Sequence, residues 1–303
     1  MIETTALPLP HGITLTCRSS GERGRPVLLF LHGFPEAAFV WDPLLAHFAQ
    51  PQHGGYRCVA PNLRGYAGSS APTEVTAYRA KHLVLDILAL IDAEAGGPGG
   101  RLAALVAHDW GGAVAWGLAA QHPERLERLA ILNSPHPGTF LRELQQSPAQ
   151  QQASAYMNFL CRPDAARLLA EDDFRRLWPF FTNMGAADGP HAWLTDAVKD
   201  QYRAVWRQGL EGGLNYYRAS PLRPPTADDP GARAVSLPRA LLDVRVPTHV
   251  LWAMYDTALP PALLDGLEVY VPQLQLTRVP DATHWIVHEQ PERVTRWLAA
   301  ALD

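Results

Sequence analysis

One stretch of the chain decides the fold: Leu102-Ala-Ala-Leu-Val-Ala-His-Asp-Trp-Gly-Gly-Ala-Val-Ala-Trp-Gly-Leu-Ala-Ala120. Its first six residues are an unbroken apolar run that predicts a buried β-strand, and the run from Ala113 has helical spacing. Between them, small residues on either side of Asp109 permit a sharp turn. A strand, a sharp turn and a helix together present the side chain at the tip as a nucleophile. An isolated aspartate in this place is more often an ordinary helix cap, so the interpretation of Asp109 depends on its partners.

Other apolar runs predict a sheet on both sides of this stretch. They are Val27–Leu31, Arg57–Ala60, Leu129–Leu132 and His249–Trp252. Runs without polar alternation are typical of parallel strands that are covered on both faces. Helical spacing between Tyr78 and Ile91 adds a crossover helix. The sequence therefore predicts an α/β fold with a mostly parallel sheet flanked by helices.

The strand pattern stops at about Pro135, and helical segments rich in aromatic residues continue to about Leu222. A proline-rich connection then leads back to the sheet. We predict a core in two parts, residues 1–134 and 223–303, with residues 135–222 inserted as a helical cap.

Partners for Asp109 come after the cap. Asp256 follows the strand that ends at Trp252, and His284 comes later in the chain. The order nucleophile, acid, histidine is that of the α/β-hydrolase fold, which we therefore predict. Asn133 ends another strand where an acid could stand, but it carries no charge, and we prefer Asp256.

A loop beginning His32-Gly-Phe-Pro35 follows the strand Val27–Leu31. In this fold such a loop provides one oxyanion donor, and the residue after the nucleophile provides the other. We predict that the backbone N–H groups of Phe34 and Trp110 form the oxyanion hole. We place His32, Pro35 and Trp110 at the substrate pocket, with His32 also bracing the loop.

Several motifs together resemble those of the soluble epoxide hydrolases. They are His32-Gly-Phe-Pro-Glu36, Arg64-Gly-Tyr66 with Gly68 and Ser69, His108-Asp-Trp-Gly-Gly112 and Leu214-Asn-Tyr-Tyr-Arg218. The similarity covers nearly the whole chain, and the aspartate elbow combined with a cap Tyr-Arg pair is the most specific part. One departure is Ala107, where the family usually has glycine. We expect the turn to form with alanine at some cost in strain.

An aspartate nucleophile suits attack on a saturated carbon, because the product is then an ordinary ester. His284, oriented by Asp256, would activate a water that hydrolyses this ester. The resemblance also implies two acids that protonate the epoxide oxygen, Tyr217 and Tyr156, whereas Tyr216 is expected to pack. The expected product is a vicinal diol. Tyrosines packed in a cap without any catalytic part are the alternative interpretation of the first two.

Two other functions are weighed against epoxide opening. A haloalkane dehalogenase would show a polar halide partner where this chain has Phe34, and a haloacetate dehalogenase would show arginines where it has Trp110 and Ala113. A protein that only binds a hormone-like ligand would have lost the nucleophile, acid or histidine, and all three are present. The dehalogenase stays the nearest alternative.

Composition narrows the remaining possibilities. The 303 residues include 47% hydrophobic and 18% charged residues with a formal net charge of −4, which gives no basic footprint for nucleic acid. No signal peptide or apolar run of membrane-spanning length is recognised, so we predict a cytoplasmic protein, as a monomer or homodimer. The three cysteines, Cys17, Cys58 and Cys161, fit neither disulfides nor a metal site and are expected to be buried. We expect no metal or cofactor, only an epoxide substrate and water.

Overall fold

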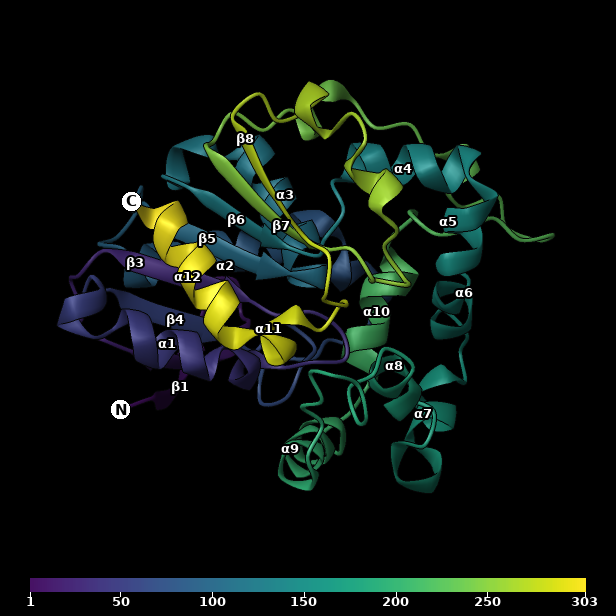
Figure 1. The fold of residues 1–303 in the computed structure, drawn as a ribbon, viewed down its shortest axis with the longest axis horizontal. Helices are drawn as coiled ribbons and strands as arrows, with labels where there is room; N and C mark the ends of the chain where they lie inside the picture. Colours follow the sequence, from purple (N-terminus) through teal and green to yellow (C-terminus); the bar gives the residue numbers. More distant parts are fainter.

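A computed structural model describes residues 1–303 and centres on one eight-stranded sheet (Figure 1). The strand order is β1-β2-β4-β3-β5-β6-β7-β8. β1 pairs antiparallel with β2, and β2 with β4, whereas all later neighbours are parallel. The strands are β1 (Glu3–Pro8), β2 (Thr14–Ser20), β3 (Val27–Leu31), β4 (Arg57–Pro61), β5 (Ala104–His108), β6 (Leu129–Leu132), β7 (Thr248–Ala253) and β8 (Leu274–Val279).

Helices cover both faces of the sheet, and β3 shows why its sequence is apolar throughout. Val27, Leu29 and Leu31 join one hydrophobic cluster, while Leu28 and Phe30 join the other. Successive side chains of a strand point to opposite faces, so both faces must be apolar when both are covered. The first face carries α2 (Ala80–Glu94) and α3 (Asp109–Gln121), and the second carries α1 (Asp42–Phe48), α11 (Ile286–Glu289) and α12 (Pro291–Leu302).

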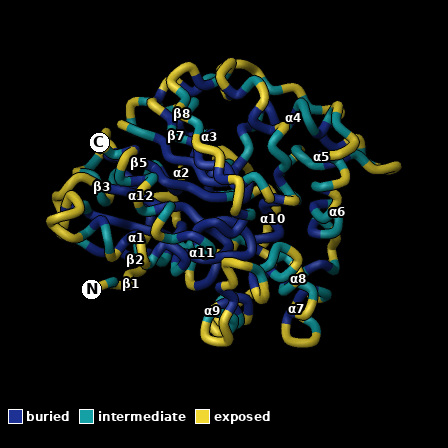
Figure 2. The backbone as a smooth tube through the Cα atoms, in the orientation of Figure 1, coloured by how far each residue is buried: buried dark blue, intermediate teal, exposed yellow.

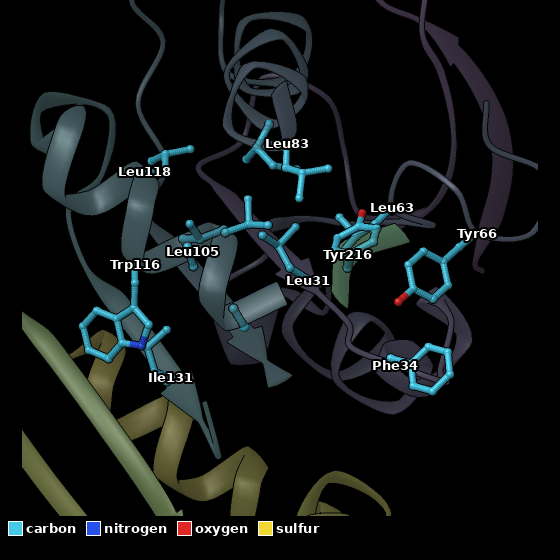
Figure 3. Packing of buried hydrophobic residues seen from close by; sticks show 14 of the residues in the cluster. Leu31, Phe34, Leu63, Tyr66, Leu83, Leu105, Trp116, Leu118, Ile131 and Tyr216 are labelled. Atoms are coloured by element: carbon cyan, nitrogen blue, oxygen red, sulfur yellow. The ribbon is translucent and has the colours of Figure 1, made fainter. Parts of the chain in front are cut away.

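The packing on the first face is seen closely in Figure 3. Leu31, Leu105 and Ile131 come from three neighbouring strands, and they face side chains of α2 and α3 such as Leu83 and Leu118. Figure 2 shows the same arrangement as a buried centre with exposed loops around it.

Seven helices are inserted between β6 and β7 and form the cap at one end of the sheet (Figure 1). They are α4 (Pro137–Gln146), α5 (Pro148–Ala153), α6 (Tyr156–Leu160), α7 (Ala165–Phe174), α8 (Trp178–Thr182), α9 (Asp196–Trp206) and α10 (Glu211–Ala219). The side-chain oxygens of Ser147 and Thr195 cap α5 and α9. The larger hydrophobic cluster runs from the sheet into the cap without a break, so the two parts share one core.

The predicted architecture, a mostly parallel sheet with flanking helices and an inserted helical cap, is confirmed. β1, β2 and β8 were not predicted, because most residues of β1 and β8 are exposed or half-buried and the strands lack apolar runs. Cys17 and Cys58 are buried as expected, but Cys161 is only half-buried. No helix combines the length and the apolar character needed to span a membrane.

Candidate active site

Asp109 stands at the turn from β5 into α3, and its backbone is strained. Its φ angle of 49° lies in the left-handed region, which a residue other than glycine adopts only at a cost. Ser134 supports the turn by donating a hydrogen bond from Oγ to the Asp109 carbonyl at 2.7 Å. At Gly111 a Cβ atom would collide with the carbonyl groups of Leu31 and His32, so glycine is required there. The buried Ala107 is accommodated before this turn.

The loop after β3 holds one oxygen of the Asp109 carboxylate. The Phe34 N–H donates to Asp109 Oδ1 at 2.7 Å. A Cβ atom on Gly33 would overlap the Asp109 side chain, so the close approach of this loop depends on that glycine. Trp110 is the second residue of α3, and the N–H groups of a first helical turn have no partner within the helix. The two N–H groups predicted as an oxyanion hole therefore come from two segments, the loop after β3 and the first turn of α3.

Asp256 and His284 lie beside Asp109, brought there by the loops after β7 and β8. Asp256 Oδ2 is 2.6 Å from His284 Nδ1, and His284 Nε2 is 3.7 Å from Asp109 Oδ2. The other Asp256 oxygen accepts from the N–H groups of Ala258 and Leu259, each at 2.9 Å. Asn133 donates to Asp256 Oδ2 at 2.8 Å, so it supports the acid instead of replacing it.

The charges of this group are strongly coupled. Burial acts to lower the pKa of His284, but the carboxylates of Asp256 and Asp109 outweigh it and raise the pKa to about 9. Burial likewise acts to raise the pKa of Asp256. The charge of His284 and the hydrogen bonds that the Asp256 carboxylate accepts outweigh burial and lower this pKa below the usual range. His284 is therefore protonated at neutral pH, and the Asp256 carboxylate is ionised.

A second polar cluster lies next to the loop after β3 and consists of the buried Glu36, His108 and Tyr202 with the half-buried His288. Glu36 Oε2 is 3.1 Å from His108 Nδ1, and Glu36 Oε1 is 2.9 Å from His288 Nε2. Tyr202 donates to Glu36 Oε1 at 3.1 Å. The cluster reaches the active site through His108 Nε2, which is 2.9 Å from the His284 carbonyl oxygen. Burial acts to raise the pKa of Glu36, but its two histidine partners lower it well below the usual range.

The sequence analysis did not find Tyr202 or His288. His288 comes four residues after His284, about one helical turn, and this spacing was the only available signal. Tyr202 lies in the cap, and nothing local in the sequence connects it with Glu36. Its contact depends on how the cap packs against the core.

Two cavities of about 70 and 230 Å³ adjoin Asp109. Asp109, Tyr156 and Tyr217 line both of them, so the two predicted tyrosines, which lie on α6 and α10 of the cap, share these cavities with Asp109. Burial and the charge of Asp109 raise the pKa of both tyrosines well above its ordinary value. Both hydroxyls therefore stay protonated at neutral pH.

The structure does not bring every predicted residue to these cavities. Trp110 lines the smaller one, but His32 and Pro35 line neither. His32 is fully buried, where its Nε2 accepts from the Leu63 N–H at 3.1 Å and braces the loop from behind. The Pro35 carbonyl points to the cap and accepts from Trp206 Nε1 at 2.7 Å. Of this loop, only Phe34 lines a cavity next to Asp109, whereas His32 and Pro35 support the loop from outside these cavities.

Comparison with known proteins gives a consistent picture. Residues 26–291 match the family model described as the alpha/beta hydrolase fold. The AB hydrolase superfamily protein YfhM of Bacillus subtilis is 33% identical over 94% of this chain and 93% of its own length. Mouse epoxide hydrolase 4 is 31% identical over 94% of this chain and 75% of its own. The crystal structure of the Bacillus megaterium epoxide hydrolase with an inhibitor superimposes with a TM-score of 0.86 at 30% identity, covering 98% and 99% of the two chains.

Proposed function

Since the chain belongs to the α/β-hydrolase family and is a hydrolase closely similar to epoxide hydrolases, we propose that it converts an epoxide to a vicinal diol through an ester on Asp109. One observation carries the proposal. A carboxylate nucleophile with a His–Asp pair on one side faces two protonated tyrosines across a cavity. Residues 135–222, the cap, supply those tyrosines.

In the first step, Asp109 attacks a ring carbon of the epoxide. Phe34 holds Oδ1, so Oδ2, which faces His284, is the attacking oxygen. The C–O bond of the ring breaks as the new ester C–O bond forms, and the electron pair goes to the former epoxide oxygen. Tyr156 and Tyr217 donate hydrogen bonds to this oxygen, and one of them transfers its proton.

In the second step, water hydrolyses the ester. The tyrosinate left by ring opening takes the proton of His284, which thereby becomes a base. His284 then takes a proton from water, and the hydroxide attacks Cγ of Asp109. The negative charge of the tetrahedral intermediate develops on Oδ1, which already accepts the Phe34 N–H, and the Trp110 N–H is the second donor. Asp256 stabilises the imidazolium that forms. Collapse of the intermediate releases the diol and regenerates the carboxylate.

The alternative, a dehalogenase that uses the same nucleophile, fits this cavity less well. A departing halide needs hydrogen-bond donors and no acid, whereas the side of the site facing Asp109 carries two tyrosines. The side chain of Phe34 packs edge-on against Tyr217, with ring centroids 5.4 Å apart, and offers no polar group to a halide.

Trapping the ester tests the proposal. In the variant His284→Gln, styrene oxide should alkylate the protein, because the nucleophile is intact and the base is missing. Intact-protein mass spectrometry should show one adduct, peptide mapping should place it on Asp109, and Asp109→Ala should show none. Haloalkane and fluoroacetate are assayed in parallel for halide release. An adduct elsewhere, or halide release without any epoxide opening, would overturn the proposed function.

A further inference from the structure

The two cavities next to Asp109 differ in size and in origin. The smaller one, about 70 Å³, lies between the start of α3 and the cap and is lined by Ala113, Phe140 and Met157 among others. The larger one, about 230 Å³, lies on the side of His284 and is lined by Phe180, Met184 and Trp285 among others. Their linings share only Asp109, Tyr156 and Tyr217, the residues of the reaction centre.

This arrangement constrains the shape of the substrate. When the epoxide oxygen lies at the two tyrosines and one ring carbon at Asp109, trans substituents on the two ring carbons point away from each other. Each substituent then enters a different cavity. A terminal epoxide has only one carbon substituent and fills one cavity, which leaves apolar surface of the other without a partner.

The lining also constrains the chemistry of the substituents. Eight of the thirteen residues around each cavity are hydrophobic, and the only ionisable side chains besides Asp109 are His284 and the two tyrosines. No arginine or lysine faces either cavity, so a carboxylate or phosphate on the substrate would be desolvated without a partner. Both substituents are therefore neutral.

From these observations, and resting on the proposed function, we propose that the substrates are neutral trans epoxides substituted on both ring carbons, with a short alkyl group in the smaller cavity and an aryl or longer alkyl group in the larger one. The larger cavity has about three times the volume of the smaller, so it takes the bulkier group. An epoxide with a phenyl group on each ring carbon does not fit, because its second phenyl group is too large for the smaller cavity.

Three epoxides that differ only in the substituent on the second ring carbon test this assignment. Styrene oxide carries a phenyl group alone, trans-1-phenylpropylene oxide adds one methyl group on the second carbon, and trans-stilbene oxide adds a second phenyl group instead. A methyl group in a hydrophobic pocket contributes roughly ten- to two-hundredfold in kcat/KM, so the phenylpropylene oxide should exceed styrene oxide by at least about tenfold. Stilbene oxide should be the poorest substrate.

A matched pair of variants separates the two cavities. Ala113 lies on α3 and lines the smaller cavity, and Ala153 lies on α5 and lines the larger one. Both positions are helical, where leucine is well tolerated. Ala113→Leu should lower the ratio of phenylpropylene oxide to styrene oxide turnover at least about tenfold. Ala153→Leu should slow both phenyl epoxides together and leave that ratio within about twofold, since it crowds only the phenyl group they share.

Single-turnover ester formation in the His284→Gln background gives the same comparison without hydrolysis. The assignment would be overturned if styrene oxide formed the ester as fast as phenylpropylene oxide or faster, or if Ala113→Leu left the ratio of the two rates unchanged. Ester formation itself would still support the proposed function. Failure of every epoxide to form an ester would overturn both. Circular dichroism and melting of the two leucine variants verify that both are folded.

Discussion

The two walls of the active site are built differently. On the sheet side, Asp109, Asp256 and His284 are fixed by short hydrogen bonds to backbone or charged groups. On the cap side, Tyr156 and Tyr217 are held mainly by aromatic packing, with the Tyr217 ring 5.0 Å from that of Trp110 and the Tyr156 ring 5.7 Å from that of Phe180. In the proposed mechanism, the sheet side sets the charges for ester hydrolysis, and the cap side provides uncharged donors for ring opening. The two walls should therefore affect different chemical steps.

The largest effect is expected on the sheet side. Asp256→Asn leaves His284 without its carboxylate and favours the wrong tautomer, so ester hydrolysis should slow by about ten-thousandfold while alkylation is largely retained. Rapid-quench mass spectrometry should show the ester accumulating. Asn133→Ala, which removes a support of Asp256 and keeps the acid, serves as a milder control. Equal slowing of both steps would remove the distinction between the walls.

On the cap side, substitutions should slow ester formation and leave ester hydrolysis largely unchanged, the opposite of the effect on the sheet side. The double variant Tyr156→Phe with Tyr217→Phe removes both proton donors with little change in packing, so ester formation should slow by about a thousandfold. Hydrolysis of ester that does form should stay within a few-fold of the wild type. Tyr216→Phe is the matched control, because that hydroxyl donates to the Arg64 carbonyl at 2.9 Å and lines neither cavity. Ester formation at the normal rate in the double variant would exclude both hydroxyls from ring opening.

The raised pKa of His284 also predicts how stability depends on pH. The folded-state pKa, about 9, exceeds the usual unfolded value of about 6.5. The folded protein therefore holds this proton more tightly, and the resulting stability is fully present below about pH 6.5 and lost as pH rises through about 9. Melting temperatures across this range should fall more steeply for the wild type than for His284→Gln. If the melting temperatures of the two proteins fell in parallel with pH, the carboxylates would not be stabilising the protonated form of His284.

Much of the site was predictable because it is local in the sequence. The elbow around Asp109 and the loop at Phe34 each combine an apolar strand with small residues, so their shape follows from a few neighbouring residues. Asp256 follows a predicted strand whose carboxyl end must lie at the same edge of the parallel sheet as that of the strand before Asp109. The strand before His284 was not predicted, and His284 was assigned from the chain order nucleophile, acid, histidine. By contrast, the links from Glu36 to Tyr202 and from Pro35 to Trp206 join segments far apart in the chain. These contacts depend on the packing of cap against core, which no local pattern specifies.

The smallest predicted effect concerns the place where the two walls meet. Trp206 of α9 donates to the carbonyl of Pro35, next to the proposed oxyanion donor Phe34, so the cap helps to fix the loop that carries this N–H. Trp206→Phe keeps a ring and loses one buried hydrogen bond, and ester hydrolysis should slow by roughly five- to tenfold. Trp178→Phe is the control, because that indole donates to Asp173 within the cap. Equal effects of the two substitutions on hydrolysis would show that the Trp206 bond supports the cap alone.

The position of the cap in the chain also matters while the protein is being synthesised. β6 pairs with β5 on one edge and with β7 on the other, and the whole cap is translated between β6 and β7. Until β7 leaves the ribosome, the four apolar residues of β6, Leu129–Leu132, carry an open edge that can pair with another chain. A nascent chain stalled within the cap is therefore prone to aggregation, although it already contains Asp109. Only the last part of the chain to be translated closes this edge of β6, and the same part adds Asp256 and His284.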